Sequence, residues 1–551
     1  MNDDNHADGH PLDRTLGHRA PLLWLALPFM GGLAAVGAGA SAPLAATLVI
    51  SLALSAAALA LERPAPSLAA LAGSMLLAGV ASGVSHRGTA ASGGERPPRA
   101  IHLSLRIRRV FPQGSPLKAG GIALIADARG LPSGLAGRRI YYSARLRPGQ
   151  PPPERTAKVA ASGLLVAVPR GRPASTFYGS LAGQGVGFML VRARILRDEE
   201  PAGAYYRFCN RLARRMDALL GEGLGSHPEL AAMYRAMMLG RKGDLQPGQK
   251  LLFIHSGAMH LFAINGVHIG MVAAALHAML ALLRCPRAPA SLAVLAVLWL
   301  DVDTTGGSPS AVRAFVMVAI LEAAFAMRRP CNPVAALAGS ALLSVLIDPM
   351  DFFSASFQMS YAVVCAILTL GLPLAGRLER RFPPFPDIPE ASWSPLQRAS
   401  ALARRHLLQA AGIGLAAGLV GAITGIQFFG LFAPVGVVLN ILLVPLASLA
   451  IVGGCLSLAI PHWGFSASPI FNRAAAVVLL GIQAIMNAGS RMPGAWMAAR
   501  FRAGWIGPAA LATLVAALIA GYASGWSRAR GGWLPPFLVV AAALAFGVKY
   551  G

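Results

Sequence analysis

The sequence predicts a polytopic α-helical membrane protein that carries a small all-β domain outside the membrane. Of its 551 residues, 55% are hydrophobic and 13% are charged, whereas soluble domains carry about 25% charged residues. Within this apolar chain, residues 87–200 are rich in Pro, Gly and Arg and contain no run long enough to cross a membrane. The composition excludes a soluble enzyme of this length, and the high apolar content excludes a disordered chain.

Three apolar runs open the chain, and each is about as long as a membrane-spanning helix. They are Pro21–Gly39, Pro43–Leu61 and Ser67–Ser85. Because two further runs follow the first almost without a break, the first is interpreted as an anchor rather than a cleaved signal peptide. Residues 1–86 are therefore expected to hold three N-terminal transmembrane helices.

Residues 87–200 are expected to form the external β domain. Polar and apolar residues alternate there in short stretches, separated by turns rich in Pro and Gly, as they do in half-buried strands. About five such stretches occur, at residues 101–107, 121–126, 139–146, 163–168 and 187–195. They predict a sandwich or a partly open barrel.

Residues 201–260 are expected to lie at the membrane surface, and residues 261–551 to return to the membrane. Tyr205–Leu220 carries Leu and Met at helical spacing with Arg between them, which is typical of an interfacial amphipathic helix. Pro228–Leu239 predicts a second short helix. About ten apolar segments follow from residue 261. Several are shorter than a full span, which favours broken helices around a polar cavity.

Loops that carry arginine predict the orientation. Arg14 and Arg19 place the N-terminus in the cytoplasm, and three spans then place the β domain outside. Continued alternation leaves Arg328, Arg329 and the 377–405 loop inside.

Polar residues within apolar segments are candidates for lining a path through the membrane, because they are costly there unless paired. Asn265 and His268 are three residues apart, so a helix presents them on one face. Gly266 and Gly270 are four apart and would let another helix approach closely. The alternative is that these polar groups only bond to a neighbouring helix.

A second polar segment ends in Arg313, which follows the helix-start pair Ser308-Pro309. Arg313 is expected either to line an aqueous path or to extend outward to the membrane surface, and Glu322 is expected to pair with an arginine. The full set of predicted channel-lining residues is Asn265, Gly266, His268, Arg313, Gln358, Ser360 and Asn440.

No hydrolytic or metal-binding motif appears. The sequence contains no G-x-S-x-G, H-E-x-x-H, H-x-H-x-D-H or P-loop pattern, and its five cysteines and twelve histidines are scattered. We therefore expect no catalytic residue, no metal site and no cofactor.

Positive charge is concentrated in the β domain. Between residues 87 and 199, 19 Lys and Arg stand against 5 Asp and Glu, with aromatic residues between them. Basic grooves with stacking aromatics hold single-stranded nucleic acid without sequence preference. The alternative is an Arg-biased external domain whose aromatics belong to its core. The predicted DNA-binding residues are Arg106, Arg108, Arg109, Arg138, Arg139, Tyr141, Tyr142, Arg145 and Arg147.

Four stretches, in order along the chain, resemble the ComEC family, polytopic channels that take transforming DNA across the bacterial inner membrane. Leu261-Phe262-Ala263-Ile264-Asn265-Gly266-Val267-His268-Ile269 resembles the helix that opens the family's competence domain, with Asn265 in place of the usual Ser. Ser308-Pro309-Ser310-Ala311-Val312-Arg313-Ala314 resembles its Ser-Pro-x-x-Arg-Ala helix start. The others are Asp348-Pro349 with Ser356-Phe357-Gln358-Met359-Ser360-Tyr361-Ala362, and Asn440 with Pro445.

The resemblance implies a channel for the uptake of single-stranded DNA in the bacterial inner (plasma) membrane, with an OB-like domain at 87–200 that holds DNA at its mouth. The implied partners are single-stranded DNA, membrane lipid, a surface DNA receptor and a cytoplasmic uptake ATPase. Many family members add a C-terminal metallo-β-lactamase-like domain. This chain is expected to lack that domain and its nuclease activity. Two other functions stay open: a transporter or exporter of another polar or anionic solute, and a membrane enzyme that uses the His255–His268 region.

Overall fold

The computed structural model describes residues 22–37, 39, 50, 53–54, 64–91, 98–111, 117–127, 135–169, 176–262, 266–329, 332–459, 468–526 and 532–551. The chain forms two compact units, which are described separately here. Unit 1 consists of Met1–Ala213 and Asn265–Gln358, and unit 2 of Arg214–Ile264 and Met359–Gly551.

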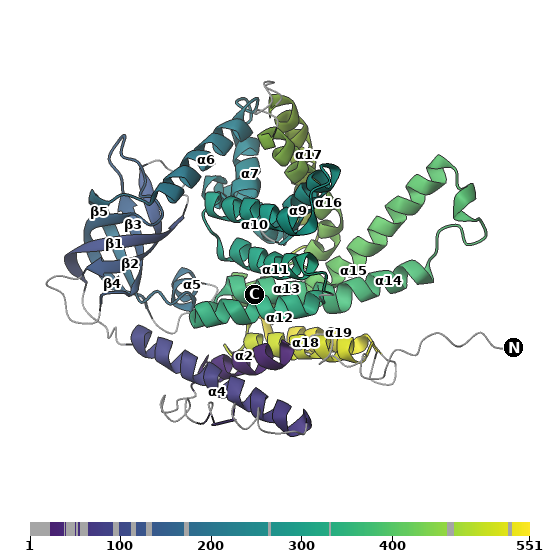
Figure 1. Cartoon of the computed structure of the whole chain (residues 1–551), viewed down its shortest axis with the longest axis horizontal. Helices are drawn as coiled ribbons and strands as arrows, with labels where there is room; N and C mark the ends of the chain where they lie inside the picture. The colour runs from purple at the N-terminus through teal and green to yellow at the C-terminus, as the bar shows by residue number, and fades with distance from the viewer. Residues whose placement is uncertain are drawn as a thin grey trace. The chain divides into compact units, whose positions relative to one another are not determined.

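Five strands of unit 1 close into a barrel (Figure 1). Their order around the barrel is β1-β2-β3-β5-β4, and neighbours are antiparallel except β3 and β5, which run parallel. The predicted small all-β domain is confirmed, as a barrel rather than a sandwich. Its strands are β1 (Arg99–Phe111), β2 (Lys118–Asp127), β3 (Arg139–Arg145), β4 (Lys158–Ala167) and β5 (Phe188–Glu200).

Every second side chain along a strand points into the interior of the barrel. β1 turns Leu103, Leu105 and Ile107 inward, and the residues between them face outward because side chains alternate along a strand. The short helix α5 (Phe177–Gly183) covers part of the outer surface and packs there against Ile122.

The remaining helices of unit 1 are apolar. Two of them, α11 and α12, begin in the same way. Ser308 and Asn332 each accept a hydrogen bond from a backbone N–H of the first turn, and a proline follows at the first helical position. The elements are α2 (Leu23–Gly37), α4 (Pro64–Ala91), α9 (Gly266–Leu282), α10 (Arg287–Thr304), α11 (Pro309–Ala326), α12 (Pro333–Ile347) and the 3₁₀ helix η4 (Pro349–Phe353).

Unit 2 is helical apart from a small sheet of order β6-β7-β8. Helix α15 (Pro395–Phe429) begins where Ser394 and Gln397 form a capping box. With α14 it makes a hairpin that projects from the other helices of unit 2 (Figure 1). Two helices cross the boundary between the units, α6 (Ala204–Gly221) and α13 (Ala355–Ala366). The other elements are α7 (Pro228–Leu239), α8 (Pro247–His255), α14 (Leu372–Arg381), α15 (Pro395–Phe429), β6 (Leu431–Phe432), α16 (Val435–Ala459), α17 (Ser468–Ser490), β7 (Met497–Phe501), α18 (Ile506–Ala523), α19 (Leu534–Phe546) and β8 (Val548–Tyr550).

Seven helices in the described part of the chain are long and apolar enough to cross a membrane, judged by length and composition. Four shorter apolar helices, α2, α9, α12 and α19, accompany them. The predicted span Pro43–Leu61 lies almost entirely outside the described residues.

Candidate functional site

Two ion pairs hold the barrel against the ends of α10 and α12 within unit 1. Arg139 Nη2 lies 2.6 Å from Asp348 Oδ2. Asp348 also caps η4, because its Oδ1 accepts a hydrogen bond from the Met350 N–H. Arg155 Nη1 lies 2.6 Å from Asp303 Oδ1, and the Asp303 side chain is only 2% exposed. A carboxylate buried this deeply needs a paired cation, so both contacts fix where the barrel sits on these helices.

Arg109 lies beside these pairs. Its Nη1 donates to Gln184 Oε1 at 3.4 Å. Burial lowers the pKa of the Arg109 guanidinium, the Asp351 carboxylate raises it, and three neighbouring arginines lower it again. Arginines and aspartates therefore lie close together at this end of the helices.

Arg313 is buried among polar partners in unit 1 and is 3% exposed. Its Nη1 lies 3.2 Å from Asp351 Oδ2, and its Nη2 donates to both the carbonyl and the hydroxyl oxygen of Ser356 at 2.7 Å. The Phe357 ring centroid is 5.9 Å from the guanidinium carbon. The Arg313 side chain does not extend outward, because these neighbours enclose it. Its place among the residues that line a path stays a prediction.

Three cations lie side by side across β2, β3 and β5 on the outer surface of the barrel. Lys118 is the register partner of Arg145, and Arg145 is the register partner of Arg194. All three residues are exposed, and within the described chain none of them forms an ion pair. We call Lys118, Arg145 and Arg194 the basic row. Like charges directly opposite one another destabilise a sheet, so a bound anion would relieve the repulsion.

A β-bulge turns Arg194 outward. β5 points Leu190 into the core, but after Arg192 the inward positions shift to Ala193 and Ile195. Arg192 has a φ of 52°, which side chains other than glycine rarely adopt, and the β3–β5 register shifts at this point. Strict alternation from Leu190 would place Arg194 in the core, so the bulge places its guanidinium beside Arg145.

An aromatic cluster shares this face. The Tyr141 ring stacks on Phe111, with centroids 6.3 Å apart, and meets Phe177 edge-on at 5.3 Å. The Phe177 side chain is 54% exposed. Tyr141 precedes Arg145 by four residues on β3, so both point outward, roughly 13 Å apart at the rise of a strand.

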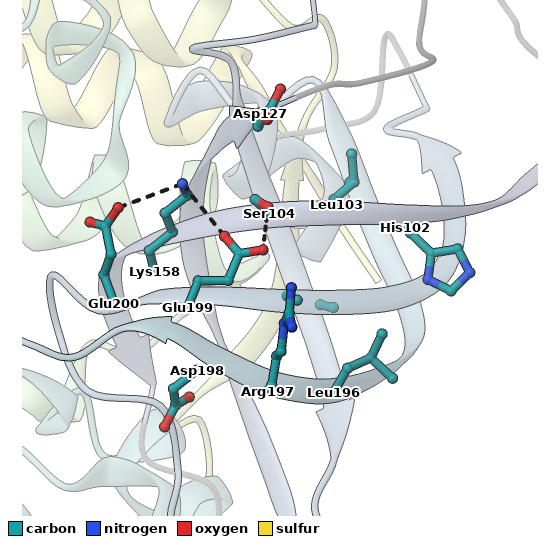
Figure 2. A pocket seen from close by; sticks show the side chains of 12 residues that line it. His102, Leu103, Ser104, Asp127, Lys158, Leu196, Arg197, Asp198, Glu199 and Glu200 are labelled. Atoms are coloured by element: carbon teal, nitrogen blue, oxygen red, sulfur yellow. Dashed lines mark hydrogen bonds and ion pairs between the residues drawn. The ribbon is translucent and has the colours of Figure 1, made fainter.

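A polar cleft of about 680 Å³ opens on β1, β4 and β5, with four acidic residues among its lining (Figure 2). Glu199 accepts a hydrogen bond from Ser104 Oγ at 2.8 Å and pairs with Lys158 Nζ at 3.5 Å. Arg106 pairs with Glu200 at 3.7 Å. The acidic lining disfavours phosphate. In the part of the chain that the structure describes, no group of three or more His, Cys, Asp or Glu could hold a metal ion.

The predicted DNA-binding residues differ in how exposed they are. Arg108, Arg145 and Arg147 are exposed, while Arg138 is half-buried. Tyr142 is 1% exposed in the barrel core. Because a base cannot stack on an enclosed ring, the structure removes Tyr142 from the set.

Three other members have partners within the chain. Arg106 pairs with Glu200. Arg109 and Arg139 each donate a hydrogen bond to Gln184, which caps the C-terminus of α5. The sequence analysis missed Lys118 and Arg194, which only the barrel register places beside Arg145. The sequence offered no signal for either residue, since Lys118 precedes the predicted stretch at 121–126 and alternation from Leu190 would place Arg194 in the core.

The predicted channel-lining residues fall in both units. Gly266, His268, Arg313 and Gln358 belong to unit 1, and Ser360 and Asn440 to unit 2. Asn265 lies outside the described residues. His268 is buried, and Gln358 Nε2 donates to the Phe352 carbonyl at 3.2 Å. Asn440 Oδ1 is buried without a hydrogen-bond partner among the described residues.

The expected close approach of a helix at Gly266 and Gly270 is wrong. A Cβ built on either glycine would meet no described atom within 4 Å. Close packing occurs instead at Gly257 and Gly436 in unit 2, where a Cβ on Gly436 would lie 3.4 Å from the Gly257 Cα.

The fold and the site together define a multi-pass helical membrane protein with an ion-paired β-barrel. Residues 237–528, more than half of the chain, match the family described as Competence protein. The chain therefore belongs to the competence protein family, as its resemblance to ComEC proteins predicted.

The chain is 28% identical over 141 residues to ComE operon protein 3 of Bacillus subtilis (strain 168). This match covers 26% of the chain and 18% of that relative, so it spans less than a fifth of the relative's length. No solved structure matches the chain.

Proposed function

We propose that this chain forms the path by which single-stranded DNA crosses the bacterial inner membrane during transformation, and that the basic row binds the strand at the entrance. Membership of the competence protein family supports a role in DNA uptake. The observation that carries the proposal is the alignment of Lys118, Arg145 and Arg194 across three strands.

The outer face of β2, β3 and β5 suits a single strand chemically. Phosphates would neutralise the basic row, and phosphate contacts supply most nonspecific affinity for nucleic acid. Bases could stack on the exposed Phe177 ring, which stacks edge-on with Tyr141; such stacking contributes about 1–3 kcal/mol per base. The strand order is consistent with an OB-like barrel, and OB-folds bind oligonucleotides on the face of strands 2 and 3.

Charge at the two ends of the unit 1 helices supports a barrel outside the membrane and an N-terminus in the cytoplasm. The barrel pairs with Asp303 and Asp348 at one end of these helices. The loops at the opposite end carry four arginines, and such loops stay in the cytoplasm. These are Arg284, Arg287, Arg328 and Arg329.

The remaining assignments belong to the same proposal. His268, Gln358, Ser360 and Asn440 would line or support the path, and the protein would act without catalysis or a cofactor. A surface DNA receptor would deliver the strand, and a cytoplasmic ATPase would draw it in.

The basic row can be tested with the full chain in lipid nanodiscs and a fluorescent single-stranded oligonucleotide. Each phosphate contact contributes about 0.7 to the slope of log K against log salt. The triple variant Lys118→Gln, Arg145→Gln and Arg194→Gln should therefore reduce the slope by about 2. A control that neutralises the exposed Arg211, Arg215 and Arg398 removes the same charge from helices rather than from the barrel strands and should leave the slope unchanged. Equal slopes in the triple variant and the wild type would reject DNA binding by the row.

The path can be tested in a transformable host that lacks the gene. The host should still bind DNA at its surface but lose transformation, and the wild-type chain should restore it. Normal transformation together with accumulation of another anionic solute would support the transporter alternative instead.

A further inference from the structure

Glu322 places a carboxylate inside an apolar helix of unit 1. It lies in the Pro309–Ala326 span, whose other charged residue, Arg313, pairs with Asp351 at the start of the helix. The Glu322 side chain is 10% exposed. Ionisable groups in membrane helices are costly and usually mark a functional site.

The carboxylate of Glu322 joins three helices. Its Oε1 lies 2.7 Å from His277 Nε2 on α9. Its Oε2 accepts a hydrogen bond from Ser291 Oγ on α10 at 2.8 Å. Neutral amides or hydroxyls could tie helices together at a lower desolvation cost. The use of a carboxylate and an imidazole therefore points to a group that exchanges protons.

Few charged groups face this pair from the helices packed against it. The Arg287 guanidinium of α10 lies over the Phe325 ring, 5.3 Å from its centroid, and that ring meets the His277 ring edge-on. Helix α12 carries no titratable residue. Asp301 and Asp303 lie at the far end of α10. Glu322 and His277 are thus each other's nearest titratable partner in the described part of unit 1.

We propose that Glu322 and His277 form a proton-binding site between α9, α10 and α11 that binds one proton reversibly. With one proton the pair is neutral overall, and with none or two it carries a net charge that apolar surroundings disfavour. Separation of the helices admits water, and the pair then releases or gains a proton. The inference stands apart from the proposed DNA path, because it uses neither the barrel nor any residue assigned to the path.

A hydrophobic carbodiimide tests the site in the purified full chain. The protonated carboxyl oxygen of Glu322 adds to the central carbon of the reagent, and the carboxyl proton passes to a reagent nitrogen. The adduct rearranges to an N-acylurea that retains the whole reagent. Mass spectrometry of the Glu322 peptide should show labelling that rises several-fold as the pH falls from 8 to 5, because a carboxyl that binds protons reversibly is protonated more often at the lower pH. No labelling at any pH, or labelling that does not change with pH, would overturn the proposal, because neither is the behaviour of a carboxyl that binds and releases a proton.

Three variants sharpen the test. Ser291→Ala removes a hydrogen bond to the ionised carboxylate and should increase labelling at pH 7 several-fold. His277→Asn should do the same, because Glu322 then loses the imidazole that shares its proton. Glu379→Gln, on the exposed α14–α15 hairpin, should leave the labelling of Glu322 unchanged. Equal labelling in wild type, Ser291→Ala and His277→Asn would also overturn the proposal.

Discussion

At Arg313 one side chain connects segments that resemble two separate motifs of the family. Its guanidinium meets Asp351 and both oxygens of Ser356, so the start of α11 is bound to η4 and the start of α13. Because the guanidinium is buried, Asp351 and Ser356 would each lose a polar contact if it were removed. The role that the contacts support is positioning of the helix ends rather than direct contact with solute.

Arg313→Gln should lower the free energy of unfolding by about 3 kcal/mol, because removing one member of a buried pair leaves the other without compensation. The loss is measured by denaturant titration in detergent. Asp351→Asn should be destabilising alone, and the double variant should cost less than the two single variants together. Arg398→Gln, at an exposed position, should change stability by less than about 0.5 kcal/mol. Strictly additive losses would contradict the pairing.

Among the elements, η4 and α5 carry the contact between the barrel and the helices of unit 1. Asp348 both caps η4 and receives Arg139. Gly307 leaves room for Arg155 to reach Asp303, because a Cβ there would lie 2.5 Å from the Arg155 Nη1. Helix caps and ion pairs thus share the same side chains, which couples the helix ends to the position of the barrel.

The double variant Gly185→Cys and Met350→Cys should form a disulfide that links the barrel to η4. A Cβ built on Gly185 lies 3.6 Å from the Met350 Cβ, within the range that a disulfide bridges. Peptide mapping under nonreducing conditions detects the link. Gly149→Cys with Met350→Cys is the matched control, since Gly149 shares a positive φ but has no atom near its Cβ position. A disulfide that forms with Gly149→Cys but not with Gly185→Cys would contradict the contact between the barrel and η4.

At the scale of the whole molecule, the α14–α15 hairpin is longer than the apolar layer of a membrane. Helix α15 has 35 residues, about 52 Å of helix, whereas the hydrocarbon core is about 30 Å thick. Its N-terminal part and α14 therefore extend beyond the apolar layer. They carry exposed arginines, Arg377, Arg380, Arg381, Arg398 and Arg405, and the proposed orientation predicts that such an arginine-rich segment lies in the cytoplasm.

An impermeant maleimide should label Ser143→Cys in intact spheroplasts and Ser400→Cys only after permeabilisation, in a background without native cysteines. Both positions are exposed, one on β3 and one in the α14–α15 hairpin. Labelling of both cysteines before permeabilisation would contradict opposite orientations of the barrel and the hairpin.

Much of the secondary structure could be predicted because its signals are local. Alternation located the five strands, and Ser308-Pro309 marked the start of α11. The partner of Glu322 could not be predicted. An arginine was expected, but His277 and Ser291 face it. His277 and Ser291 are far from Glu322 in the sequence, and no local pattern links the three residues. Only the packing of three helices brings them together.

The sequence by itself determined a membrane protein with a basic β domain, since composition and periodicity fix which segments avoid water. The tertiary structure alone decided which charges are paired and which are free. Arg139 meets a carboxylate 209 residues away, whereas Arg145, six residues along the chain, meets Lys118 and Arg194. The physical reason is that barrel register and helix packing, rather than sequence distance, set the neighbours of a side chain. The same concentration of arginine therefore serves docking at one end of β3 and an exposed basic row at the other.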